Sequence, residues 1–132
     1  MTVEAKTVAQ YMITTHKTVR DNSTVSEAVH QLLKAKLPGC VVVDAMHHPV
    51  GFLSEQDCLR QMLEGRYHQS DSALVRDVMS KTIISVPPDM SIIELAQMMI
   101  QPKPKIYPVI DRGKLVGEIR RSDVLKALSD SK

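Results

Sequence analysis

The sequence predicts an α/β fold of the mixed α+β type, in which one β-α-β-β-α unit occurs twice. Two observations predict it. The chain repeats itself at a shift of about half its length, and both halves show the same order of helical and strand patterns. With 132 residues, 43% of them hydrophobic, the chain is long enough to form one compact module with its own core.

The repeat is visible residue by residue. Met79 lies 67 positions after Met12, and Asp111 lies 67 positions after Asp44. A one-residue deletion then changes the shift to 66. We place the repeats at residues 7–64 and 74–130, with the polar stretch 65–73 as the linker. The other matching pairs are Thr24 with Ser91, Glu27 with Glu94, Gly51 with Gly117, Asp57 with Asp123 and Leu59 with Leu125.

Each repeat is expected to begin with a short helical turn, at Val8–Met12 and Val75–Met79, followed by a brief strand, at Thr18–Val19 and Ser85–Val86. A longer helix comes next. Its start is marked in both repeats by a hydroxyl residue with a glutamate three positions on, which is the pattern of a capping box. These pairs are Thr24 with Glu27 and Ser91 with Glu94. The apolar face of this helix is expected at Val25, Val29, Leu32 and Leu33, and at Ile92, Leu95, Met99 and Ile100.

Two apolar runs separated by turn residues then predict a hairpin in each repeat. A last helix follows, from about Glu55 to Glu64 and from about Arg121 to Leu128. Because such a unit exposes one apolar sheet face, we expect the two units to pack with pseudo-two-fold symmetry, which leaves two related clefts. The runs are Cys40–Val43 with Val50–Leu53, and Ile106–Ile110 with Leu115–Ile119.

Two motifs occur in order in both repeats. The first ends a strand, as Val41-Val-Val-Asp44 and Pro108-Val-Ile-Asp111; the second has the pattern Gly-x-x-(Ser/Thr)-x-x-Asp, as Gly51 to Asp57 and, with arginine at the fourth position, Gly117 to Asp123. From about Val8 to Leu128 the chain thereby resembles a tandem pair of CBS motifs, also called a Bateman module. The resemblance implies a regulatory module without an obligatory cofactor, which binds adenosine-containing ligands such as AMP, ADP, ATP or S-adenosylmethionine and commonly forms a homodimer.

The second motif fits this chemistry best in the first repeat. The Ser54 hydroxyl can cap the following helix and donate to a phosphate near its N-terminus. The Asp57 carboxylate, one turn into the helix, can accept both hydroxyls of a ribose. The alternative is that Asp57 only stabilises the helix start, where acidic residues are favoured in any case. In the second repeat Arg120 replaces the hydroxyl ahead of Asp123, and either clamps a phosphate or fills the pocket.

The resemblance also implies which residues line each cleft. The cleft of Ser54 and Asp57 would be walled by apolar residues that hold adenine, and that of Asp123 by a histidine and a lysine, which depart from the apolar pattern. We therefore expect one competent site, that of Ser54 and Asp57. Basic residues at 103, 105 and 121 would reach the phosphates or form a solvated loop. The apolar residues that would hold adenine are Met79, Ile83 and Ile84, and the histidine and lysine of the other cleft are His16 and Lys17. The basic residues are Lys103, Lys105 and Arg121.

Other functions are weighed against this one. Catalysis is not expected, because His47 and His48 fall in a predicted turn, Cys40 falls in a buried strand, and there is no metal-ligand cluster. A ligand-free homo-oligomeric interaction module is the main alternative. The apolar residues of the terminal helices would form either core or a homodimer face: Leu59, Met62, Leu63, Val124, Leu125 and Leu128.

Nucleic-acid binding is the last alternative, and a net charge of only +2 does not favour it. It would depend on the basic residues of the second repeat, which are Lys103, Lys105, Arg112, Lys114, Arg120 and Arg121. We expect a cytoplasmic protein with Cys40 and Cys58 as buried free thiols, because there is no apolar signal core and no membrane-spanning run. Any protein that it regulates would be a separate chain, or the module would act alone as a ligand buffer or sensor.

Overall fold

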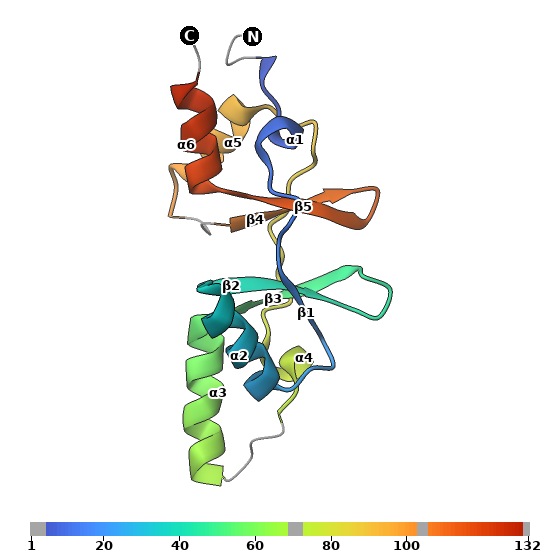
Figure 1. The fold of residues 1–132 in the computed structure, drawn as a ribbon, viewed down its shortest axis with the longest axis vertical. Helices are drawn as coiled ribbons and strands as arrows, with labels where there is room; N and C mark the ends of the chain where they lie inside the picture. Colours follow the sequence, from blue (N-terminus) through green and yellow to red (C-terminus); the bar gives the residue numbers. More distant parts are fainter. Residues whose placement is uncertain (1–4, 69–72, 103–105, 131–132) are drawn as a thin grey trace. The chain divides into compact units, whose positions relative to one another are not determined.

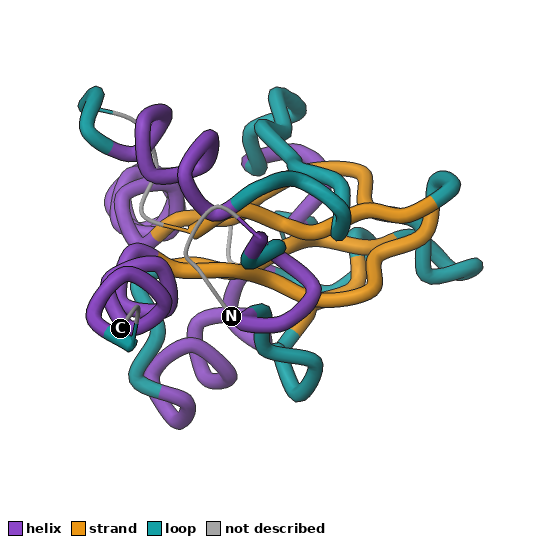
Figure 2. Tube along the Cα trace, turned by 90° about the horizontal axis from the view of Figure 1, so that it is seen from above, coloured by secondary structure: helices purple, strands orange, loops and turns teal. Residues whose placement is uncertain are grey.

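The computed structural model describes residues 5–68, 73–102 and 106–130, with only the backbone for residues 65–68. The chain divides into two compact units. One is the continuous segment Lys17–Ile83, and the other combines Met1–His16 with Ile84–Lys132. The chain contains both helices and strands, which confirms the predicted α+β class (Figure 2).

The unit Lys17–Ile83 contains a three-stranded sheet in the order β1-β2-β3. Strand β1 runs parallel to β2, and β2 runs antiparallel to β3, as expected for a β-α-β connection followed by a hairpin. The elements are β1 (Thr18–Arg20), α2 (Val25–Ala35), β2 (Gly39–Val43), β3 (Pro49–Ser54), α3 (Glu55–His68) and α4 (Val75–Val78). Helix α3 therefore runs beyond the predicted end at Glu64 and takes residues 65–68 from the predicted linker.

The other unit has the same plan with a smaller sheet. Strands β4 and β5 form an antiparallel pair. The strand predicted at Ser85–Val86 is reduced to a single parallel bridge between Val86 and Val109. This bridge is the counterpart of the Val19–Val42 pair in the first repeat. The elements are α1 (Val8–Tyr11), α5 (Ile92–Met99), β4 (Ile106–Asp111), β5 (Lys114–Arg120) and α6 (Arg121–Ser129).

The leading segments of the two repeats are exchanged between the units. Helix α1 lies with α5 and α6, and α4 lies with α2 and α3 (Figure 1). Thr7 forms an antiparallel bridge with Ser91, and Leu74 forms the equivalent bridge with Thr24. Each bridge joins the residue before a short helix to the N-cap of a long helix. The sequence repeats therefore differ from the compact units, because each unit is completed by the first turn of the other repeat.

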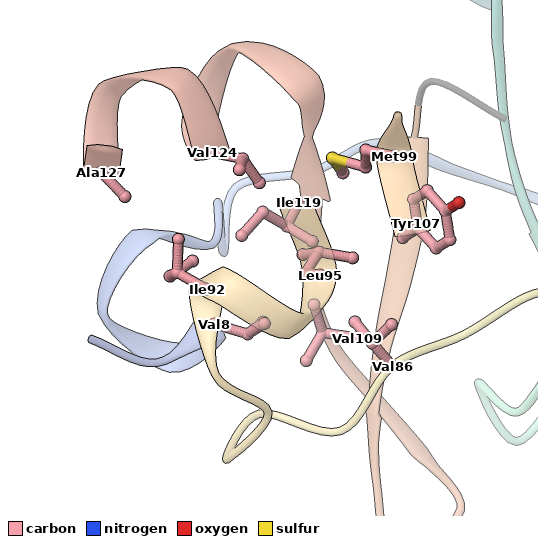
Figure 3. Packing of buried hydrophobic residues seen from close by; sticks show 10 residues of the cluster. All are labelled: Val8, Val86, Ile92, Leu95, Met99, Tyr107, Val109, Ile119, Val124 and Ala127. Atoms are coloured by element: carbon pink, nitrogen blue, oxygen red, sulfur yellow. The ribbon is translucent and has the colours of Figure 1, made fainter. Parts of the chain in front are cut away.

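Each unit buries its own apolar cluster. In the discontinuous unit, side chains from α1, α5, α6 and the β4–β5 pair meet around Leu95 and Ile119, which are fully buried (Figure 3). Val8, from the exchanged helix α1, is also fully buried in this cluster. In the unit Lys17–Ile83, Val75 from α4 occupies the equivalent place. Each exchanged helix thus contributes to a core that its own repeat does not form.

Glycine is required where the exchanged segment crosses the hairpin. A Cβ added at Gly51 would lie 2.5 Å from Sδ of Met79 and 2.7 Å from the main-chain oxygen of Ser80. A Cβ added at Gly117 would lie 2.9 Å from both Sδ of Met12 and the main-chain oxygen of Ile13. The glycines of the two motifs therefore allow close backbone packing within each unit.

The predicted helical faces are correct except at one position in each repeat. Val25, Leu32, Ile92, Leu95 and Met99 are buried, and Val29 is half-buried. Leu33 and Ile100, in contrast, are 67% and 82% exposed. These two residues are 67 positions apart, so the same exposure occurs in both repeats. The helical period places them at the edge of the apolar stripe, where they fall outside the core.

The two capping signatures also behave differently. Thr24 and Glu27 form the complete box, because the Thr24 hydroxyl accepts from the Glu27 N–H (3.1 Å) and the Glu27 carboxylate accepts from the Thr24 N–H (2.9 Å). The bonds that the Glu27 carboxylate accepts from the Thr24 N–H and then from the Thr24 hydroxyl (3.0 Å) lower the pKa of Glu27. At α5, Ser91 accepts from the Glu94 N–H (3.0 Å), but the return bond is not formed between these two described residues. The box predicted there is only half present.

The exchange can be tested with a matched pair of core substitutions. Val8→Ala and Val75→Ala each remove two methyl groups from a fully buried site, so each should lower the free energy of unfolding by roughly 2 kcal/mol. Hydrogen exchange should separate them. Val8→Ala should speed amide exchange most in α5 and β5, and Val75→Ala should speed it most in α2 and β3. The reverse pattern would show that each short helix supports its own repeat.

Candidate functional site

Ser54 and Asp57 are joined by a reciprocal set of hydrogen bonds where strand β3 passes into helix α3. The Ser54 hydroxyl accepts from the Asp57 N–H (3.1 Å) and donates to Oδ2 of Asp57 (2.9 Å). Oδ2 also accepts from the Ser54 N–H (3.0 Å). The Ser54 hydroxyl hydrogen is therefore engaged with Asp57, and the predicted donation to a phosphate would require this bond to open.

The other carboxylate oxygen of Asp57 is less committed. Oδ1 lies 3.6 Å from Nη1 of Arg60, whose side chain is 67% exposed, while the Asp57 side chain is 18% exposed. An ion pair of this length at the surface contributes about 0–1 kcal/mol. The N–H of Glu55, the first in the helix, is already satisfied by the carbonyl oxygen of Pro38 (2.9 Å). What this helix start offers to a ligand is mainly Oδ1 and the partly exposed side of the carboxylate.

The second motif has a different arrangement. Oδ2 of Asp123 accepts from the Arg120 N–H (2.8 Å), so the carboxylate half of the cap is kept. The Arg120 side chain instead pairs with Glu118 two residues earlier, with Nε at 2.8 Å and Nη2 at 2.7 Å from Oε2. Arginine has no acceptor atom, so it cannot replace the serine hydroxyl at the helix start.

The residues expected to hold adenine lie in different surroundings. Met79 is half-buried and packs against the core of the unit Lys17–Ile83, in which Ser54 and Asp57 also lie. Ile83 is half-buried. Ile84 packs against the other core cluster.

The remaining predicted ligand residues are only partly placed. His16 is half-buried, and its Nδ1 atom is buried without a hydrogen-bond partner in the described part of the chain. Lys17 is exposed. Lys103 and Lys105 lie outside the described residues.

Arg121 is exposed at the first position of α6 and acts electrostatically on a residue that the sequence did not single out. Tyr107 is fully buried, and within the described residues its hydroxyl has no hydrogen-bond partner. Figure 3 shows this hydroxyl directed away from the other labelled side chains. Burial raises the pKa of Tyr107, and the charge of Arg121 opposes this effect.

The sequence patterns also do not indicate that two further charged residues are buried. Glu118 is 3% exposed and Lys6 is 4% exposed. Nζ of Lys6 donates to the carbonyl oxygen of Ala127 (2.9 Å), in the last turn of α6, where a cation is favourable. It also lies 5.4 Å from the centre of the Tyr11 ring. No local sequence pattern predicts that either residue is buried. Lys6 contacts Ala127, which is distant in the sequence, and Glu118 is a polar residue of strand β5.

The residues of the catalytic alternative are engaged in structural contacts. Cys40 and Cys58 are both buried thiols, as predicted, and burial, followed by the charge of Asp57, raises the pKa of Cys58. His48 and His47 are exposed in the β2–β3 turn, where the Asp44 carboxylate accepts from the His48 N–H (2.8 Å), and this bond lowers the pKa of Asp44. Across the described ranges, no three His, Cys, Asp or Glu side chains are grouped to hold a metal ion.

The basic residues of the nucleic-acid alternative do not form one described patch. Arg112 and Lys114 lie at the turn between β4 and β5. Arg120 and Arg121 lie at the opposite end of β5, roughly 20 Å away along an extended strand. Arg120 is moreover paired with Glu118. Among the described helices, none is long and apolar enough to cross a membrane.

Comparison with protein families gives two matches along the chain. The model described as CBS domain matches residues 8–64 and again residues 75–130. The CBS domain-containing protein YhcV of Bacillus subtilis is 32% identical over 118 residues, which are 89% of this chain and 81% of that protein.

An uncharacterized protein of Methanopyrus kandleri, MK0525, is 27% identical over 105 residues, which are 78% of this chain and 53% of that protein. The match to another archaeal relative, MJ1225 of Methanocaldococcus jannaschii, spans 39% of its length. The chain therefore spans about half or less of these two relatives.

Solved structures share the fold over nearly the whole chain. The crystal structure of CBSX2 in complex with AMP has a TM-score of 0.80 at 26% identity, covering 92% of this chain and 94% of that one. A putative acetoin utilization protein, AcuB of Vibrio cholerae, has a TM-score of 0.82 at 25% identity, covering 92% of this chain and 88% of that one.

The Ser54–Asp57 cap makes a prediction about stability. Ser54→Ala should lower the free energy of unfolding by about 1 kcal/mol, because the Asp57 N–H loses its acceptor, whereas Ser54→Thr keeps the hydroxyl and should cost much less. Urea unfolding of the three proteins measures the difference. Equal stability of the alanine variant and the wild type would mean that the hydroxyl does not cap α3.

Proposed function

This chain belongs to the CBS domain family, and we propose that it is a regulatory module that binds an adenosine-containing ligand at the start of helix α3. The family match and the AMP complex of the related CBSX2 support this class of ligand. The observation that carries the proposal is the state of the Asp57 carboxylate. One oxygen holds the helix cap, and the other has only a long contact with an exposed arginine.

A ribose fits the oxygen that remains. Oδ1 has lone pairs for two hydroxyl donors, and neighbouring ribose hydroxyls can reach one oxygen together. Binding through Oδ1 leaves the cap on Oδ2 intact, so the helix start does not have to rearrange. The ribose would replace only the 3.6 Å ion pair with Arg60, which is worth little at the surface.

The other parts of the ligand are assigned by residue type. We propose that Met79, Ile83 and Ile84 contact the adenine, because they are partly buried apolar residues. We propose Lys105 and Arg121 for the phosphates. AMP, ADP, ATP and S-adenosylmethionine all satisfy the ribose and adenine parts of this proposal.

The proposal includes no catalytic step, because a sensor needs only reversible binding. We also propose a cytoplasmic location, because Cys58 is a buried thiol and cysteines stay reduced in such compartments.

A specific observation favours homodimer formation as a second property. Leu59 and Met62 on α3 are 62% and 53% exposed, and Leu125 and Leu128 on α6 are 64% and 37% exposed. The second pair lies 66 positions after the first. Leu33 and Ile100 form a third exposed pair at equivalent positions. Burying these apolar residues against a second copy would be favourable.

The ligand proposal is tested by AMP titration calorimetry with Asp57→Asn. The amide keeps an acceptor for the Ser54 N–H but loses the charge that strengthens the bonds to ribose hydroxyls. We expect AMP binding to weaken about 10- to 100-fold. Asp123→Asn is the matched control and should leave the AMP affinity unchanged. Equal weakening by both variants would contradict the assignment to the first repeat.

The dimer proposal is tested by sedimentation with Leu59→Glu. A charge in an apolar interface should convert the dimer to a monomer, because it would be desolvated without a partner. Met46→Glu is the control, since Met46 is 78% exposed but lies in the β2–β3 turn rather than on a helix. A monomeric wild-type protein, or dissociation caused equally by Met46→Glu, would overturn the proposal.

A further inference from the structure

Glu118 is a buried acid in strand β5, between Gly117 and the apolar residue Ile119. Its side chain is 4% exposed; its carbonyl oxygen accepts from the Ile13 N–H (2.8 Å), and its N–H donates to the Ile13 carbonyl oxygen (3.0 Å). Ile119, the next residue, is fully buried in the core. Because side chains alternate along a strand, Glu118 and Arg120 lie together on the face opposite Ile119.

Two of the three guanidinium nitrogens of Arg120 reach the same oxygen of Glu118. Nε lies 2.8 Å and Nη2 lies 2.7 Å from Oε2, which are short, charge-assisted hydrogen bonds. A carboxylate this deeply buried requires a partner, because an unpaired buried charge is strongly unfavourable. The guanidinium of Arg120 is therefore committed to Glu118, and its positive charge is balanced.

The first repeat has different residues at the same two positions. Phe52 is the counterpart of Glu118, and Ser54 is the counterpart of Arg120, each 66 positions earlier. Phe52 pairs with Ser80 as Glu118 pairs with Ile13, so the backbone settings are equivalent. Only the side-chain chemistry differs: a ring and a hydroxyl in the first repeat, and an acid and a base in the second.

We propose that the Glu118–Arg120 pair is a specificity determinant that closes the second motif to adenine nucleotides. This inference rests on the proposed function. A nucleotide phosphate near Arg120 would meet a cation that is already neutralised, with a carboxylate directly behind it. The helix start also lacks the hydroxyl that caps α3. The chain consequently binds one nucleotide, at the first repeat.

The test replaces the pair and counts bound AMP by titration calorimetry. Glu118→Gln with Arg120→Ser removes both charges together, so no buried charge is left alone, and restores the hydroxyl before Asp123. Glu118→Phe with Arg120→Ser copies the first repeat fully. The wild type should bind one AMP per chain, and at least one double variant should bind two. In either variant, adding Asp123→Asn should return the count to one.

The outcomes separate this inference from the proposed function. A wild type that binds two AMP molecules, or folded double variants that still bind one, would overturn the closing role of the pair and leave the first site standing. A wild type that binds none of AMP, ATP and S-adenosylmethionine would overturn the proposed function itself. The single variant Arg120→Ser should unfold at lower urea concentration than the double variants, and equal midpoints would show that Glu118 does not depend on Arg120.

Discussion

Main-chain pairing between the start of a short helix and the start of a long helix is the constraint on which both units depend. The bridges Thr7–Ser91 and Thr24–Leu74 bring Val8 and Val75 into cores that the other repeat builds. Since this pairing is crosswise, neither repeat can complete its core from its own residues. Each of the two small cores therefore contains a fully buried side chain from the other repeat.

The same positions in the two repeats carry different electrostatic arrangements. At the first helix start a serine and an aspartate satisfy each other and leave one carboxylate oxygen for a ligand. At the second helix start, Arg120 forms an ion pair with the buried Glu118 two residues earlier in its strand. The backbone is repeated closely, while the charged contacts at the two helix starts differ.

Several exposed apolar residues occur at equivalent positions of the two repeats. Leu59 and Leu125 occur at equivalent positions and have nearly equal exposure. A face that appears once could be a local accident of packing. A face that appears in both units keeps apolar surface in water twice, and burial against another copy would offset that cost. The helices thus pack against the core on one side and expose apolar side chains on the other.

The sequence alone determined the order of elements, the hairpin pairs, most core positions and the two motifs, because these depend on local periodicity, turn residues and the internal match. Tertiary structure decided which segment completes which core, since the bridge between Thr7 and Ser91 joins residues far apart in the chain. It also decided the exposure of Leu33 and Ile100 and the pairing of Arg120 with Glu118. Local patterns describe which residues prefer burial, but a side chain's partner is set by the distant segments that pack beside it.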